Sequence, residues 1–175
     1  SMIVTASPWR RQLARDANAL ERWTIRPRGA RREYTLENKL FSCAFAIRRL
    51  AEANRLTDKA AQGTITGKRY PLKDEERLPD FTDWQDVGEY YDLDTPEELT
   101  LSVTDFAARI LSSFFLEFLD NDDGYATGLW VGSDHQGRHG VYRFRMSEVI
   151  DLFRGTSPDA RNRSPLRLTF RPAAD

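Results

Sequence analysis

Arginine alternates with apolar residues in two short segments near the C-terminal end of the chain. In the first segment, VYRFRM, Arg143 and Arg145 alternate with Tyr, Phe and Met. In the second, LRLTFR, Arg167 and Arg171 lie opposite Leu and Phe. Because successive side chains of a strand point to opposite faces, each segment predicts a strand with one apolar and one cationic face. If the two strands share a sheet, four guanidinium groups project from one side of it.

An aromatic side chain is expected on the same face. Trp130, flanked by Leu129 and Val131, lies in a third segment of strand composition. Cationic side chains around an exposed aromatic ring are typical of proteins that hold single-stranded nucleic acid, by phosphate contacts and base stacking. We therefore take five residues as a candidate binding site: Trp130, Arg143, Arg145, Arg167 and Arg171.

Charge is distributed very unevenly along the chain, although the formal net charge is only −1. Residues 1–32 carry eight Arg against two carboxylates, whereas residues 74–123 carry sixteen carboxylates against two Arg. Residues 124–175 are again net positive. This segregation predicts a protein partner bound through complementary charged patches. Two plainer interpretations stay open: the Arg residues only solubilise the sheet, or the acidic segment 71–98 covers them.

Catalytic and metal-binding motifs are absent from the sequence. Asp134, His135 and His139 form its only histidine cluster, and the neighbouring Gly137 and Gly140 predict a turn there rather than a preorganised metal site. We therefore expect no metal and no cofactor. A protein-interaction module is the first functional hypothesis, a single-stranded nucleic-acid-binding protein the second, and an enzyme without a recognisable motif, using His135 or His139, the third.

Composition is typical of one folded domain spanning residues 1–175. Hydrophobic residues make up 40% of the chain and aromatic residues 11%, enough for a core. The single cysteine, Cys43, excludes an intramolecular disulfide and is expected to be buried in a helix. Together with the lack of a membrane-spanning apolar stretch, this predicts a cytoplasmic protein that does not bind membranes.

Apolar periodicity predicts the helices. The first thirty residues favour a helix that starts near Pro8 and ends before the segment 25–32. A second helix is expected over 36–51, with Thr35 as its N-cap and an exposed Arg48–Glu52 pair. Two further helices are expected over 103–112, capped by Thr104, and over 147–154, capped by Ser147 and ending at Gly155.

Strand composition and turn signals predict the sheet. Residues 71–98 are expected to be irregular and to pack by their aromatic side chains. The fold class is predicted as α+β, a mostly antiparallel sheet packed against two to four helices. Its strands are a meander within about 114–146, the segment 64–70 and a C-terminal strand, Leu166–Phe170.

Overall fold

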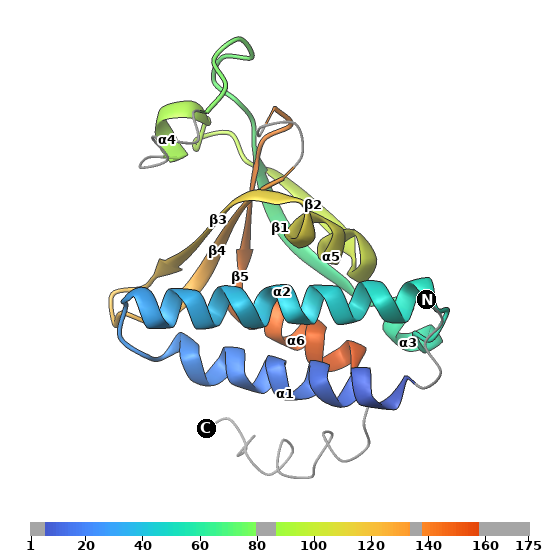
Figure 1. Cartoon of the computed structure of the whole chain (residues 1–175). Coiled ribbons are helices and arrows are strands. Elements are labelled where there is room, and N and C mark those ends of the chain that lie inside the picture. Colours follow the sequence, from blue (N-terminus) through green and yellow to red (C-terminus); the bar gives the residue numbers. More distant parts are fainter. Residues whose placement is uncertain (1–5, 80–86, 134–137, 158–175) are drawn as a thin grey trace, which may run out of the picture.

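The computed structural model describes residues 6–79, 87–133 and 138–157. In this part of the chain, five antiparallel strands form one sheet in the order β2-β1-β5-β4-β3. Six helices accompany the sheet, which confirms the α+β class and the meander formed by β3, β4 and β5 (Figure 1). The elements are α1 (Ser7–Thr24), α2 (Ala30–Glu52), α3 (Asp58–Ala61), β1 (Thr64–Tyr70), α4 (Val87–Tyr90), β2 (Glu97–Ser102), α5 (Val103–Leu111), β3 (Ser113–Asp120), β4 (Ala126–Ser133), β5 (Val141–Arg145) and α6 (Met146–Thr156).

Helices α1 and α2 form an antiparallel pair beside the sheet. Pro8 lies in the first turn of α1, as predicted, and the buried side of α1 carries Leu13 and Leu20. Helix α2 begins at Ala30, five residues before Thr35, so the prediction of Thr35 as its N-cap is wrong. The Thr35 hydroxyl instead donates a hydrogen bond of 2.8 Å to the carbonyl of Arg31 within the helix.

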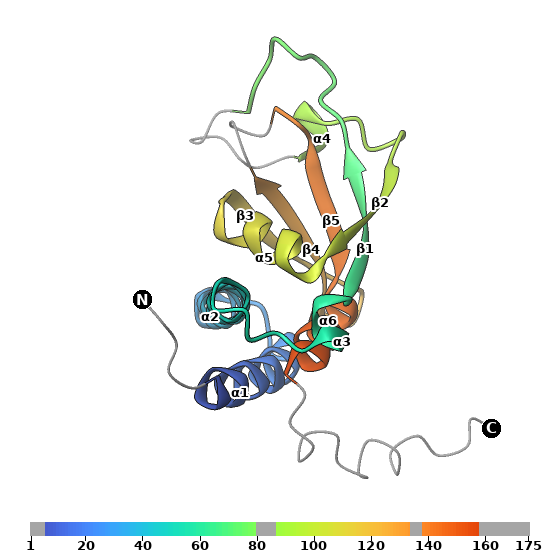
Figure 2. The same cartoon turned by 90° about the vertical axis from the view of Figure 1, so that its right-hand side faces the viewer.

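The helical layer covers one face of the sheet, which we call the inner face. Helix α5 packs between α2 and the strands, and α6 runs from the end of β5 back to α1 (Figure 2). Aromatic rings of three elements meet in the core: Phe106 of α5 lies 5.0 Å from Phe144 of β5 and 6.0 Å from Phe153 of α6 between ring centroids. Cys43 is also buried in this core, as predicted, and burial raises the pKa of its thiol well above the ordinary value.

The predicted caps of two further helices differ from those observed, although both helices start within one residue of the predicted position. Helix α5 begins at Val103, and its cap is Ser102, whose hydroxyl accepts a hydrogen bond of 3.1 Å from the amide of Asp105; the prediction of Thr104 is wrong. Leu99 and Leu101, which come before the helix, lie in β2. Helix α6 follows β5 directly, with Arg145 rather than Ser147 at its N-cap position, and it continues past Gly155.

A buried arginine joins the helical pair to the sheet. Arg32, at the start of α2, is 1% exposed. Its guanidinium donates to the carboxylates of Glu33 and Asp120 at 2.6 and 2.7 Å and to the carbonyl oxygens of Arg26 and Gly124 at 3.2 and 3.1 Å. Since Asp120 and Gly124 flank the β3–β4 turn, this one side chain fixes that hairpin against the α1–α2 turn.

The described residues contain no helix that is long and apolar enough to span a membrane. The predicted C-terminal strand, Leu166–Phe170, lies outside the described residues.

Candidate functional site

The face of the sheet opposite α2 and α5, which we call the outer face, carries one row of side chains that crosses all five strands. The pairing of β1 places Lys68 opposite Glu98 on one side and opposite Arg143 on the other. Arg143 lies opposite Trp130, and Trp130 lies opposite Glu117 on β3. Residues directly opposite each other in antiparallel strands point to the same face. The row therefore has cations at its centre and a carboxylate on each edge strand.

Trp130 belongs to this row but is not exposed, so the prediction of an exposed aromatic is wrong. Its side chain is 6% exposed and lies in a second hydrophobic cluster with Tyr70, Tyr90, Tyr91 and Val141. The Tyr70 ring meets it edge-on, with 5.1 Å between the ring centroids. Strand alternation correctly gives the face of Trp130, but it does not reveal what lies over that face.

The cover over Trp130 comes from the acidic segment. Residues 71–73 and 90–92 lie side by side, because the amide of Asp92 donates to the carbonyl of Pro71 and the amide of Lys73 donates to the carbonyl of Tyr90, at 2.8 and 2.9 Å. Tyr90 and Tyr91 are thereby held against the sheet. The described part of this segment therefore covers the aromatic end of the outer face.

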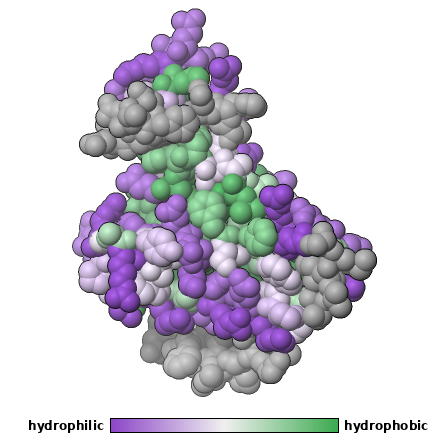
Figure 3. Space-filling view, viewed as in Figure 1, coloured by the Kyte–Doolittle hydropathy of each residue, from purple (hydrophilic) through white to green (hydrophobic). Residues whose placement is uncertain are grey.

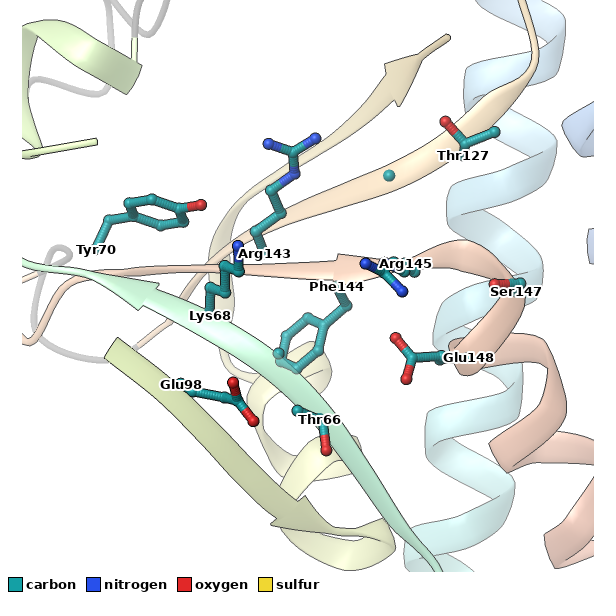
Figure 4. A pocket seen from close by; sticks show the side chains of 12 residues that line it. Thr66, Lys68, Tyr70, Glu98, Thr127, Arg143, Phe144, Arg145, Ser147 and Glu148 are labelled. Atoms are coloured by element: carbon teal, nitrogen blue, oxygen red, sulfur yellow. The ribbon is translucent and has the colours of Figure 1, made fainter. Parts of the chain in front are cut away.

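The other end of the outer face is a groove of about 540 Å³. Figure 4 shows its side chains converging from β1, β2, β5 and the first turn of α6. Gly128 of β4, opposite Arg145, contributes no side chain to the lining, and the Leu119 side chain of β3 lies beside it. Its lining includes the charged and hydroxyl side chains of Thr66, Lys68, Glu98, Thr127, Arg143, Arg145, Ser147 and Glu148.

The three cations of the groove have no carboxylate within ion-pair distance in the described part of the chain. Lys68, Arg143 and Arg145 are all exposed. The Arg143 guanidinium instead lies over the Trp130 ring, with its carbon 5.6 Å from the ring centroid. Lys68 and Arg143 are like charges directly opposite each other, an arrangement that destabilises a sheet. The two cations therefore lie side by side on the outer face without a carboxylate between them.

Some cations elsewhere in the molecule are paired with carboxylates. Arg69, the neighbour of Lys68 on the opposite face of β1, lies 2.9 Å from Glu97. Arg154 of α6 donates to Glu21 of α1 at 2.8 and 3.0 Å. These hydrogen bonds raise the pKa of Arg154, although partial burial opposes the shift. Lys68, Arg143 and Arg145 differ from these two arginines, because none of the three has a carboxylate at ion-pair distance in the described residues.

The structure brings together only part of the predicted site. Arg143 and Arg145 share the groove, Trp130 is adjacent but covered, and Arg167 and Arg171 lie outside the described residues. Lys68, Glu98 and Glu148 were not predicted as site residues. Alternation within β1 could have placed Lys68 on one face, but only the strand register brings it beside Arg143.

The predicted histidine turn contributes no site in the described residues. His139 is exposed, whereas Asp134 and His135 lie outside the described residues. Within that part of the chain, no group of three or more His, Cys, Asp or Glu side chains could hold a metal ion.

The groove is suited to binding an anionic group. Guanidinium and ammonium groups form short charge-assisted hydrogen bonds with carboxylate or phosphate oxygens. The hydroxyls of Thr66, Thr127 and Ser147 line the same space and are further donors. The first turn of α6 follows Arg145 directly, and a helix N-terminus adds a partial positive charge.

Comparison of the chain with protein-family models, curated proteins and solved structures finds no match.

Proposed function

We propose that this chain is a protein-interaction module that binds an acidic side chain of a partner protein in the outer-face groove. The observation that carries the proposal is the set of three exposed cations, Lys68, Arg143 and Arg145, without a carboxylate at ion-pair distance in the described residues. Such a set attracts an anion and orients it as it arrives. The single Cys43 is compatible with a reducing compartment such as the cytoplasm.

A protein partner is favoured over single-stranded nucleic acid. Base stacking needs an exposed ring, and Trp130 is covered by Tyr90 and Tyr91. Glu98 and Glu148 also line the groove, so its three cations share the space with two carboxylates. A phosphate backbone carries a charge at every nucleotide and meets these carboxylates as well as the cations, whereas a protein segment can present one carboxylate alone.

Amide chemical shifts test the proposal. An octapeptide of Ser with a single central Glu, titrated into the ¹⁵N-labelled protein at low salt, is expected to shift the amides of Lys68, Arg143 and Arg145. Raising the salt concentration should weaken the effect, because the contacts are between exposed charges. Lys68→Glu combined with Arg143→Glu should abolish it.

The matched control makes the same charge change on α1. Arg15 and Arg22 are exposed on that helix, remote from the groove lining. Arg15→Glu combined with Arg22→Glu should leave the shifts at the groove in place. Equal losses in both double variants, or shifts outside the groove, would reject the proposal. Tighter binding of an octathymidylate than of the acidic peptide, through the same amides, would favour the nucleic-acid alternative.

A further inference from the structure

The geometry points to a partner segment of mixed charge, in which a basic residue lies three positions from the acidic residue that enters the groove. This inference rests on the proposed function and specifies the partner's charge pattern. It follows from the row of side chains across the sheet, in which Glu98 and Arg143 are separated by two strand spacings.

The spacing of the row sets the spacing of the partner's charges. Neighbouring strands lie about 4.8 Å apart, so Glu98 on β2 is displaced about 10 Å across the sheet from Arg143 on β5. A peptide in the polyproline II conformation advances about 3.1 Å per residue and has three residues per turn, so side chains three positions apart point the same way and lie about 9 Å from each other. A carboxylate bound at Arg143 therefore places the residue three positions away over Glu98, where a Lys or Arg side chain fits.

The opposite end of the row, at Glu117, does not require a basic residue from the partner. Glu117 on β3 is also two strands from Arg143. However, Arg28 from the α1–α2 turn already lies 3.7 Å from Glu117, so the protein supplies a cation there itself. Glu98 has no cation within ion-pair distance in the described residues, although Lys68 is its neighbour in the row. The additional basic residue is therefore expected on the β2 side alone.

A purely acidic segment fits this surface less well. Its second carboxylate would lie over Glu98 or beside Glu148, and like charges at close range are unfavourable. A segment of mixed charge pairs with the cations and with Glu98 at once. The groove thus selects against polyanions while it accepts a single anion.

Three heptapeptides of Ser with few charges separate these possibilities. The first carries Lys three positions from Glu, tested in both sequence directions because an extended peptide can lie either way across the strands. The second has the same composition with Lys and Glu adjacent, and the third carries Glu alone. Dissociation constants come from titrations of the ¹⁵N-labelled protein. We expect the better direction of the spaced peptide to bind about two- to fivefold more tightly than either of the others, the range of one exposed ion pair.

A double-mutant cycle identifies Glu98 as the source of that preference. Glu98→Gln should make the spaced peptide and the Glu-only peptide bind equally. Glu37→Gln, the same change at an exposed position of α2, should leave the preference intact. Preference for the spaced peptide that survives Glu98→Gln would overturn the inference.

The proposed function fails by a different result. If the Glu-only peptide binds in the groove as tightly as the spaced peptide, the charge pattern is rejected and the acidic-partner function stands. If none of the peptides shifts the amides of Lys68, Arg143 and Arg145, the proposed function itself is rejected.

Discussion

The guanidinium of Arg143 lies against the indole of Trp130, and this contact marks the boundary between the two ends of the outer face. On one side of the ring, Tyr70 and Val141 form a dry cluster under α4. On the other side of the ring, the Arg143 side chain lines the polar groove. The Trp130 ring thus contacts both the covered end of the outer face and the Arg143 side chain of the proposed binding groove.

Trp130→Ala is expected to lower the free energy of unfolding by about 3–5 kcal/mol, as for other large aromatic residues removed from a core. Trp130→Phe keeps a ring beneath Arg143 and should cost clearly less. Urea denaturation followed by circular dichroism measures both. A loss below about 1 kcal/mol for Trp130→Ala would show that the cluster under α4 does not pack as described.

Two glycines should respond to alanine in opposite directions. A Cβ atom at Gly67 would lie 2.5 Å from the Phe144 ring and 2.8 Å from the backbone oxygen of Arg143, so Gly67→Ala should destabilise the protein by about 1–3 kcal/mol. A Cβ atom at Gly155, within α6, meets nothing within 4 Å. Gly155→Ala should stabilise by about 0.5–1 kcal/mol. Thermal unfolding of the two variants gives the signs, and a shared sign would contradict the packing of β1 against Phe144.

Two substitutions distinguish the observed cap of α5, Ser102, from the predicted cap, Thr104. Ser102→Ala removes the hydroxyl that accepts from the Asp105 amide and should cost about 1 kcal/mol. Thr104→Ala, at the predicted but incorrect cap position, should change stability by less than about 0.5 kcal/mol. Chemical denaturation of both variants is the measurement, and a larger loss at Thr104 would restore the predicted cap.

Replacement of Arg32 by Met should destabilise the protein by about 3 kcal/mol, because its partners lose a buried donor. Asp120 and Glu33 would keep their charges, and the carbonyl oxygens of Arg26 and Gly124 would lose a hydrogen bond. Urea denaturation tests this, with Arg48→Met as the control on the exposed side of α2, where Arg48 pairs with Glu52 as predicted. Equal small losses in both variants would contradict the structural role of Arg32.

Protonation of Glu33 should lower the free energy of unfolding as the pH falls. Partial burial disfavours its charged form, but the hydrogen bonds from Arg32 and from the Gly29 amide outweigh this and lower its pKa in the folded protein. A lowered pKa in the folded state adds stability above the unfolded value, about 4.3, and this contribution is lost as the pH falls through the folded value.

The free energy of unfolding between pH 7 and pH 3 tests that sign. It should fall less in Glu33→Gln than in the wild type, whereas Glu37→Gln, on the exposed side of α2, should follow the wild type. A Glu33→Gln variant with an unchanged pH dependence would show that Glu33 does not titrate in this way.

Local patterns in the sequence predicted most elements, because periodicity and turn residues act within a few positions of the chain. Strand β1 and the β3–β5 meander were predicted from strand composition between turn residues, and the turn before β4 from Gly124, whose φ is +80°. The predictions of helix cap residues were less accurate. Thr35 and Thr104 can cap a helix, but the backbone entered the helix earlier in both cases.

The candidate site could be predicted only in part, because it depends on contacts between distant segments. Alternation placed Arg143 and Arg145 on one face, and this is confirmed. The pairing of Arg143 with Lys68 spans more than seventy residues and has no local signal. The cover over Trp130 has none either, since it depends on how residues 87–91 return to the sheet.

The position of Trp130 also provides an internal optical probe. Indole emission responds to a nearby charge and to the polarity around the ring. An anion that draws the Arg143 guanidinium away from Trp130 changes the charge beside the ring, whereas release of α4 admits water on its other side. The chain holds three other tryptophans, at positions 9, 23 and 84. With these three replaced by Phe, the fluorescence of Trp130 can report occupancy of the groove and loss of the cover as separate spectral changes, without a label attached to the protein.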